Sequence, residues 1–298
     1  MAKNSNIDLT IVFAVIFPNN LSYFTSFIKS LENQTNNQFK LVLINDGVKN
    51  INKYLKETSL IYDVINVHGL TPFEIRIQGL ISISKLKPAY IIFADTDDTF
   101  SENRIETQLK YLKIYPIVCN DIHTTDENGN VLKRNIWGER LGNEYKFDIQ
   151  FLKNKNIVGL GNTGIQFFIL VKILEKIKNL KEGNDWILFS SVGNHLKGLF
   201  ISTCTTNYRQ HDFNIIGKKA IDKLKLLQII ETKINHYQTL INLGVDCFDV
   251  LTELNKNQKI RNLLNNNLQK SEEIIKYLAS LNRNFFWWEE PNLLINNL

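Results

Sequence analysis

The sequence predicts an α/β protein built on a mostly parallel sheet, and two observations support this prediction. Short runs rich in β-branched and aromatic residues alternate with helical patterns as far as about residue 121. Between successive runs, apolar residues recur every three or four positions, which is the spacing of an amphipathic helix crossing over between parallel strands. We expect five strands in this part of the chain, at residues 9–17, 39–45, 62–67, 90–95 and 116–121.

Two crossover helices are expected between these strands. The first has an apolar stripe from Leu21 to Leu31, and the second has one from Phe73 to Ser84. In such sheets ligands bind at the carboxyl ends of the strands. The sequence therefore directs attention to Asn45-Asp46-Gly47 and to Asp95-Thr96-Asp97-Asp98, which end the second and fourth strands.

The second half of the chain has a mixed pattern. Asn128-Gly129 predicts a hairpin turn, and helices are expected from Val171 to Leu180 and from Asp185 onward. A strand is expected from Leu199 to Ser202, and the polar residues 205–217 are expected to form a loop.

Beyond that loop the chain is predicted to be helical. An apolar stripe at helical spacing runs from Ile221 to Ile241, and two further helical segments follow as far as Leu281. We therefore divide the chain into a main domain at residues 1–217 and a C-terminal helical extension at residues 218–298.

The composition excludes several functional classes. With 298 residues and 44% apolar content the chain can bury a large core, and 35 basic against 30 acidic residues does not indicate a nucleic-acid-binding protein. Cys119, Cys204 and Cys247 are too widely spaced for a disulfide framework or a zinc knuckle. Neither a signal peptide nor a run of roughly 18 apolar residues is recognisable, so we expect a cytoplasmic protein.

Three carboxylates crowd the end of the fourth strand at Asp95, Asp97 and Asp98, and we call residues 95–98 the acidic edge. Such crowding is unfavourable unless a cation is bound, and Mn²⁺ or Mg²⁺ can bind few protein oxygens while water and substrate phosphates fill its other positions. The alternative is an Asp-rich loop that caps a helix beginning near Ser101.

The order of the motifs resembles the family 2 glycosyltransferases over most of residues 7–217. The motifs carrying the resemblance are Asn19-Asn20-Leu21-Ser22-Tyr23-Phe24, Ser30-Leu31-Glu32-Asn33-Gln34-Thr35, Asn45-Asp46-Gly47, Arg76 with Gly79, Asp95-x-Asp97-Asp98, Asn120-Asp121, Asp126-Glu127-Asn128-Gly129, Asn184-Asp185-Trp186 and Tyr208-Arg209-Gln210-His211. The resemblance implies a GT-A fold, in which residues 1–217 form the glycosyltransferase domain.

The resemblance also implies a role for individual residues. Asp185 is expected to be the catalytic base, and Asp97 and His211 are expected to bind Mn²⁺ or Mg²⁺. The residues expected to bind the nucleotide sugar are Phe17, Pro18, Asn19, Asp46, Arg76, Asp95 and Thr96.

The implied activity is transfer of a sugar from a nucleotide diphosphate, UDP- or dTDP-linked, to the hydroxyl of a carbohydrate or glycolipid acceptor. A carboxylate facing the sugar can take the acceptor proton while a cation neutralises the departing diphosphate, so a single displacement inverts the anomeric centre. Synthesis of a bacterial polysaccharide or glycoconjugate is the expected setting.

Two rival functions stay open. Asn45, Ile77 and Asn184 depart from the family pattern, and Asn45 and Asn184 leave open a non-catalytic module that binds nucleotide sugars. The stretch Gly159-Leu160-Gly161-Asn162-Thr163-Gly164 spells the G-x-G-x-x-G of NAD-dependent oxidoreductases, which requires a buried strand before it and a helix after it.

The C-terminal extension offers two kinds of contact. Its lysines, beginning at Lys218 and Lys219, and the aromatic run Phe285-Phe286-Trp287-Trp288 suit a peripheral membrane contact at the inner face of a membrane. The aromatic residues would equally suit packing on the main domain or a homodimer contact through the C-terminal helices.

Overall fold

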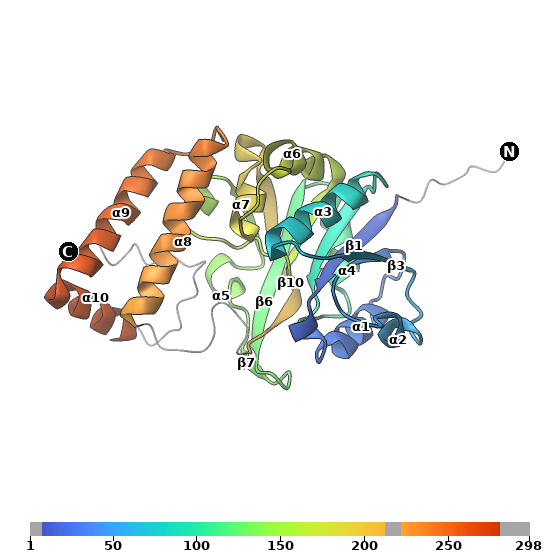
Figure 1. Cartoon of the computed structure of the whole chain (residues 1–298). Helices are drawn as coiled ribbons and strands as arrows, with labels where there is room; N and C mark the ends of the chain where they lie inside the picture. The colour runs from blue at the N-terminus through green and yellow to red at the C-terminus, as the bar shows by residue number, and fades with distance from the viewer. Residues whose placement is uncertain (1–7, 212–221, 281–298) are drawn as a thin grey trace.

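The structure, a computed structural model, describes residues 8–211 and 222–280 (Figure 1). The strands in this part of the chain are β1 (Thr10–Ile16), β2 (Lys40–Asp46), β3 (Tyr62–Val67), β4 (Tyr90–Asp95), β5 (Thr99–Phe100), β6 (Ile117–Thr125), β7 (Val131–Lys133), β8 (Glu144–Asp148), β9 (Thr163–Gln166) and β10 (Lys197–Arg209). The α-helices are α1 (Phe24–Glu32), α2 (Asn52–Leu55), α3 (Pro72–Ser84), α4 (Arg104–Leu112), α5 (Gly138–Leu141), α6 (Phe167–Ile177), α7 (Asp185–Ser190), α8 (Lys223–Asn242), α9 (Val250–Asn266) and α10 (Leu268–Ser280). Short 3₁₀ helices are η1 (Pro18–Asn20), η2 (Phe151–Lys153) and η3 (Gly193–His195).

All these strands join one sheet in the order β3-β2-β1-β4-β9-β6-β10-β5, with β7 beside β6 and β8 beside β10. The pairs β1–β2, β1–β4, β2–β3 and β6–β10 are parallel, and β9 lies antiparallel between β4 and β6. The five strands expected from the sequence are all present, so the predicted α/β class with a mostly parallel sheet is confirmed. Because β1, β2, β4, β6 and β10 point the same way, their carboxyl ends meet at one edge.

The sheet is covered by helices on both faces, and β1 shows why. Its alternate residues Ile11, Phe13 and Val15 belong to one apolar cluster with α3, α6 and α7, whereas Val12 and Ala14 belong to a second cluster with α1 and α4. Side chains along a strand point alternately to the two faces, so a strand buried on both faces reads as a continuous apolar run.

Helix α3 begins at a complete capping box. Thr71 accepts from the backbone N–H of Glu74, the Glu74 carboxylate accepts from the backbone N–H of Thr71, and Pro72 occupies the first helical position. Gly79 lets this helix approach the sheet, because a Cβ at that position would lie 2.7 Å from side-chain atoms of Phe13 and Ile44. This contact gives a structural reason for the glycine of the Arg-x-x-Gly motif.

The prediction was wrong about the length of the last strand. β10 extends to Arg209, although residues 205–217 were expected to form a loop. Its polar residues lie in a ladder between β6 and β5, and a register shift between Ile201 and Thr205 interrupts the pairing with β6. Residues 212–217 lie outside the described residues.

Smaller differences concern two helix starts and two short strands. Helix α6 begins at Phe167, four residues before the expected Val171, and α4 begins at Arg104 rather than near Ser101. The short strands β8 and β9 were not expected, because each has five residues or fewer and gives little periodicity. The hairpin turn at Asn128-Gly129 is present between β6 and β7, and Gly129 has a φ of 89°.

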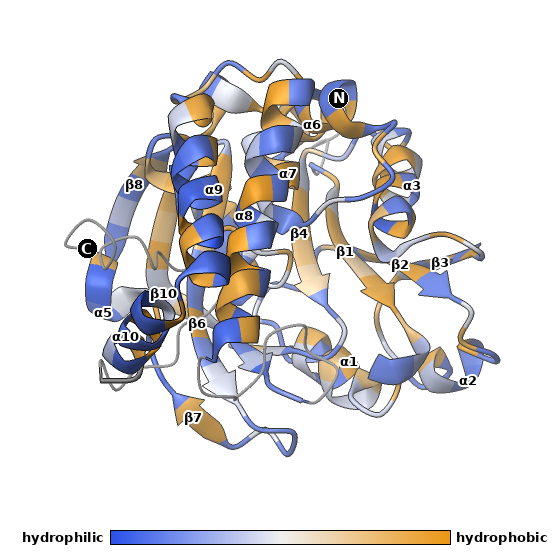
Figure 2. Ribbon diagram, turned by 60° about the vertical axis from the view of Figure 1, so that its left-hand side comes forward, coloured by the Kyte–Doolittle hydropathy of each residue, from blue (hydrophilic) through white to orange (hydrophobic). Residues whose placement is uncertain are grey.

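The C-terminal helices α8, α9 and α10 stack at one end of the molecule, as Figures 1 and 2 show. Helix α8 packs on α7, and its buried residues Leu226, Ile230 and Tyr237 share the apolar cluster of the central sheet. The division at residue 217 stays a prediction, and that boundary and Phe285–Trp288 lie outside the described residues. In the described part of the chain no helix combines the length and the apolar content needed to cross a bilayer.

Candidate functional site

The end of β4 carries the acidic edge, as the sequence predicted. Thr96 is buried, and its hydroxyl donates to the carbonyl of Val15 at 3.0 Å, which ties the turn after β4 to the end of β1. The backbone N–H of Asp98 donates to the carbonyl of Asp95 at 3.2 Å, so the four residues form a tight turn. Thr96 is thus held by the fold, and its expected contact with a nucleotide sugar stays a prediction.

The two residues predicted to bind a metal ion lie together. His211 Nε2 is 3.0 Å from Asp97 Oδ2, although 114 positions separate them in the sequence. The imidazole ring stacks on Tyr23, with ring centroids 5.1 Å apart. Two neighbouring ligands of a six-coordinate ion with bonds of roughly 2.1 Å also lie about 3 Å apart, so the pair has the spacing of adjacent metal ligands.

Arg209 holds the acidic edge from the end of β10. Its backbone N–H donates to Asp98 Oδ1 at 2.9 Å, and its Nε donates to the carbonyl of Asp97 at 2.8 Å. The guanidinium lies 4.8 Å from the ring centroid of Tyr23, which also stacks on His211. β10 therefore delivers His211 to Asp97 through a fixed set of contacts.

The carboxylates of the acidic edge are electrostatically strained. Burial, and then the charge of Asp97, raises the pKa of Asp95 to about 7, and burial together with Asp97 and Asp95 raises the pKa of Asp98 well above its ordinary value. Asp98 Oδ2 is buried and accepts no hydrogen bond. Negative charge is thus concentrated beyond what the surrounding protein neutralises, as in a site that binds a cation.

A buried arginine lies beneath the acidic edge. Arg104 is 1% exposed, donates to the carbonyl of Phe93 at 2.6 Å and to Asn120 Oδ1 at 2.9 Å, and lies over the ring of Phe100. Burial lowers its pKa to about 10, while its charge lowers the pKa of Asp95. Sequence reasoning missed this residue because an arginine near a helix start usually points to solvent.

Asp185 occupies the first position of α7 at the same edge of the sheet. Asn184 caps this helix by accepting from the backbone N–H of Ile187 at 3.0 Å. Asp185 Oδ2 accepts from the backbone N–H of Leu160 at 3.1 Å, and the charge of Asp185 raises the pKa of Asp95. The expected base and the acidic edge are therefore close enough to act on one substrate.

Residues 159–162 form a loop between Asp185 and the acidic edge. A Cβ at Gly161 would lie 2.8 Å from Asp98 Oδ2 and 3.1 Å from Asp95 Oδ2, so only glycine permits this approach. The Asn162 side chain accepts from the backbone N–H of Gly159 and donates to the carbonyls of Asn120 and Ile157. Sequence reasoning singled out these glycines without identifying their contact with the carboxylates.

The same loop excludes the oxidoreductase reading of the G-x-G-x-x-G pattern. Residues 154–162 contain neither strand nor helix, and the pattern leads into strand β9 rather than into a helix. The helix N-terminus that would receive a pyrophosphate in a dinucleotide-binding fold is therefore missing from this position.

The residues expected to bind the nucleotide sugar lie along the same edge, and their roles stay predictions. Phe17 is half-buried, Pro18 and Asn19 are exposed in η1, and Asp46 ends β2. Arg76 lies with its guanidinium 5.6 Å from the ring centroid of Phe17 and lowers the pKa of Asp95.

Asn45, which departs from the family pattern, has a structural role. Its amide group donates to the carbonyl of Val48 at 3.0 Å and to Asn66 Oδ1 at 2.9 Å, and its Oδ1 accepts from the backbone N–H of Val48. These bonds hold the turn after β2 and leave Asp46 as the acidic residue of that turn.

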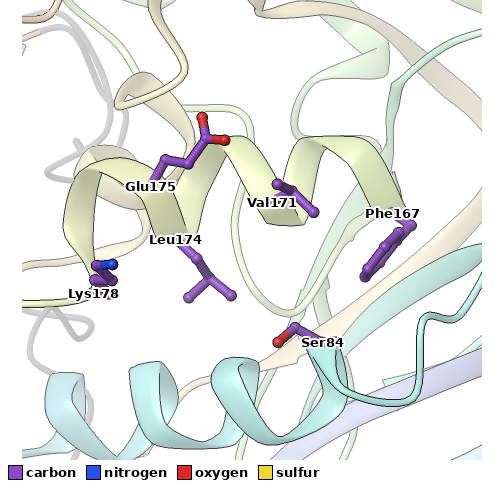
Figure 3. A pocket seen from close by; sticks show the side chains of 6 residues that line it. All are labelled: Ser84, Phe167, Val171, Leu174, Glu175 and Lys178. Carbon is purple, nitrogen blue, oxygen red and sulfur yellow. The ribbon is translucent and has the colours of Figure 1, made fainter.

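A shallow pocket of about 280 Å³ lies elsewhere, between α3 and α6 (Figure 3). It is lined by Ser84, Phe167, Val171, Leu174, Glu175 and Lys178. No residue of the acidic edge contributes to it. Charge and geometry, rather than this hollow, therefore identify the candidate site.

The donors at the acidic edge fit a hard divalent cation in part. In residues 8–211 and 222–280, no group of three or more His, Cys, Asp and Glu side chains forms a ready ligand set. Asp97 and His211 could supply two ligands, and the buried, unsatisfied Asp98 Oδ2 belongs to the residue that follows Asp97 in the chain. The remaining positions would have to be filled by water or by phosphate oxygens, as Mn²⁺ and Mg²⁺ permit.

The comparisons with known proteins concern the fold and the family. The fold is the GT-A fold: a structure of residues 1–349 of S. aureus TarS with UDP-GlcNAc aligns with a TM-score of 0.57 at 11% identity, over 86% of this chain and 72% of that chain. A structure of GalNAc-T7 with UDP, GalNAc and Mn²⁺ aligns with a TM-score of 0.57 at 12% identity, over 88% of this chain and 59% of that chain.

The chain belongs to glycosyl transferase family 2, because residues 13–178 match the sequence profile of that family. An "Uncharacterized glycosyltransferase" of Rickettsia bellii (strain RML369-C) is 31% identical over 147 residues, which cover 46% of this chain. The match covers a fifth of the length of that curated relative. The predicted family and fold are thereby confirmed.

Proposed function

We propose that this protein transfers a sugar from a UDP- or dTDP-linked donor to an acceptor hydroxyl, with inversion at the anomeric carbon. The proposal is supported by two groups that lie at one edge of the sheet. Asp97 and His211 lie 3.0 Å apart, and the carboxylate of Asp185 lies on the other side of the Gly161 loop. The acceptor we propose is a carbohydrate or a glycolipid, and the setting is synthesis of a bacterial polysaccharide or glycoconjugate in the cytoplasm.

Asp97 and His211 would hold Mn²⁺ or Mg²⁺. When bound, such an ion neutralises the negative charge that develops on the departing diphosphate. Arg76 would face the phosphates as a fixed positive charge, and Asp46 and residues 17–19 would contact the nucleoside. Arg209 bonds the backbone carbonyl of Asp97 and the carboxylate of Asp98, so the two expected ligands, Asp97 and His211, would not have to be assembled for each donor.

Asp185 would accept the proton of the acceptor hydroxyl as that oxygen attacks the anomeric carbon. The Leu160 N–H donates to Asp185 Oδ2, which leaves Asp185 Oδ1 as the oxygen for the acceptor. A single displacement is proposed because no second carboxylate pattern suggests a nucleophile for a double displacement.

The experiment is a panel of nucleotide sugars with Mn²⁺, scored by release of the nucleoside diphosphate with and without EDTA. We expect release from one UDP- or dTDP-linked donor, its loss in EDTA, and loss of the Mn²⁺ response in Asp97→Asn. Glu57→Gln, a change at an exposed carboxylate outside the expected site residues, is the matched control. Binding of donors without release or transfer from any of them would instead favour a non-catalytic nucleotide-sugar-binding module.

A further inference from the structure

Helix α8 contacts the helix that bears Asp185. Trp186 follows Asp185 directly and is fully buried. Its indole stacks on the imidazole of His236, with ring centroids 3.8 Å apart and an interplanar angle of 10°, and Tyr237 meets it edge-on at 5.9 Å. The residue next to the expected base is therefore clamped by two aromatic side chains of α8.

The same helix holds a second segment that leads to Asp185. Three consecutive backbone carbonyls accept side-chain hydrogen bonds: that of Leu152 from Trp186 Nε1, that of Lys153 from the Tyr237 hydroxyl, and that of Asn154 from Lys233 Nζ. The first two bonds are 2.9 Å and 2.8 Å long. Residues 152–154 are thus fixed to α7 and α8 without belonging to a sheet.

This segment continues into the loop that touches the carboxylate. Asn156 Oδ1 accepts from the backbone N–H of Val158, the carbonyl of Ile157 accepts from Asn162, and the N–H of Leu160 donates to Asp185 Oδ2. Two routes therefore run from α8 to Asp185, one through Trp186 and one through residues 152–160.

A lysine is an uncommon residue at a fully buried position such as 233. Lys233 is 0% exposed on a helix face that otherwise buries apolar residues such as Ile229, Ile230 and Leu240. Burying an ammonium group is unfavourable, and replacing buried charged groups by apolar side chains of similar volume is often neutral or stabilising. A lysine is explained if the position of the Asn154 carbonyl matters for function.

We propose that helix α8 positions the carboxylate of Asp185, and that Lys233, His236 and Tyr237 are the positioning residues. The inference rests on the proposed role of Asp185 as the base. It makes helix α8 part of the catalytic apparatus, although these three side chains are buried in the protein.

The test compares Lys233→Met with Lys259→Met in the full chain. Lys259 is an exposed lysine on α9, so its substitution removes the same charge without touching either route. We expect Lys233→Met to lower kcat about tenfold while KM for the donor stays within about twofold, because a small displacement of a catalytic group weakens the chemical step. Its midpoint of urea unfolding should match or exceed that of the wild type.

Hydrogen exchange supplies a readout that does not depend on turnover. Exchange of the amides in residues 157–162 should be about tenfold faster in Lys233→Met and unchanged in Lys259→Met, because the loop opens locally when its anchor is lost. Tyr237→Phe should change exchange and kcat in the same direction by a smaller factor, and it keeps the test available if Lys233→Met does not fold.

The outcomes separate the two proposals. Wild-type exchange and wild-type kcat in both α8 variants would overturn the positioning role and leave the proposed transferase function intact. A wild-type protein that releases no nucleoside diphosphate from any donor would overturn the proposed function, and with it the role of Asp185 on which the inference rests, whatever the exchange shows.

Discussion

Two buried cations, Arg104 and Lys233, lie in different regions of the molecule but make the same kinds of contact. Each is almost completely buried, donates to a backbone carbonyl and lies over an aromatic ring: Arg104 bonds Phe93 and lies 4.3 Å from the centroid of Phe100, and Lys233 bonds Asn154 and lies 5.5 Å from that of Trp186. The first lies under the acidic edge, and the second lies between α7 and α8.

The electrostatic surroundings of the two cations differ. The charges of Asp98 and Asp95 act on Arg104 and counteract the lowering of its pKa by burial, whereas the charge of Lys233 adds to burial in lowering the pKa of His236. Arg104 therefore balances negative charge, and Lys233 holds a chain segment in place. A buried cation is informative about function only when its partners are known.

The largest effect is expected from substitution of Asp185, the carboxylate that the second region is proposed to position. Asp185→Asn should lower kcat by about 10² to 10⁴-fold, since it removes a general base, while affinity for UDP with Mn²⁺ stays close to that of the wild type. Nucleoside diphosphate release and calorimetry measure the two quantities. Turnover equal to that of the wild type would contradict the proposed role of Asp185 as the base, and with it the functional difference between Asp185 and the acidic edge.

Removal of each cation tests the comparison directly. Arg104→Met should lower the free energy of unfolding by about 3–5 kcal/mol, because it leaves Asp95 and Asp98 without their buried counter-charge. Lys233→Met should leave that free energy unchanged or raise it. Urea unfolding of both variants gives the measurement. Equal decreases in the free energy of unfolding would show that the two cations contribute to stability in the same way.

The pH dependence of stability should differ between the same two variants. Because the pKa of Asp95 is raised to about 7 in the folded protein, the folded state binds protons more tightly than the unfolded chain, and this contribution to stability is lost as the pH rises from about 4 through 7. The apoprotein should thus be less stable at about pH 8 than at about pH 5, and Mn²⁺ should reduce the difference. Arg104→Met should raise the pKa of Asp95 further and enlarge the stability difference between the two pH values, whereas Lys233→Met should not change that difference. Stability that does not vary between about pH 5 and about pH 8 would contradict the raised pKa of Asp95.

The smallest effect is expected from substitution of Thr71, which connects helix α3 near the acidic edge with the chain before α7. Thr71 caps α3, which bears Arg76, and its hydroxyl also donates to the carbonyl of Lys181 before α7. Thr71→Ala should lower the free energy of unfolding by about 1 kcal/mol, as loss of a helix cap does. Thr58→Ala, a substitution of a partly exposed threonine outside both regions, gives a comparison value. If Thr71→Ala lowers the free energy of unfolding well beyond that value and leaves kcat unchanged, the contact between Thr71 and Lys181 has a structural role alone.

The sequence was sufficient for the parallel strands and for the acidic edge. Continuous apolar runs ending in carboxylates predict both, because such strands are buried on both faces and end at a common edge. The neighbourhood of Asp97 and His211 followed from the family resemblance, since a separation of 114 positions carries no local signal.

The rest could not be predicted, for physical reasons that particular residues show. Arg104 is a charged residue at a helix start, which usually faces solvent, and Lys233 interrupts the apolar stripe of α8 without any signal of the backbone carbonyl that it bonds. The end of β10 includes polar residues with specific partners: the Thr206 hydroxyl donates to the carbonyl of Gly161, and the Asn207 amide donates to the Thr99 hydroxyl. Asn184 appeared to be a departure from an acidic pair, yet an asparagine is among the best residues for the N-cap that it provides.

The extension of β10 to Arg209 has a consequence for the energetics of cation binding. A ligand carried by a free loop must give up backbone freedom of roughly 1–2 kcal/mol per residue when it binds. His211 lies two positions beyond a strand whose last residue is already bonded to Asp97 and Asp98, and its ring already stacks on Tyr23. Little ordering is then left for the metal ion to impose, so the apoprotein should bind Mn²⁺ measurably before any nucleotide arrives.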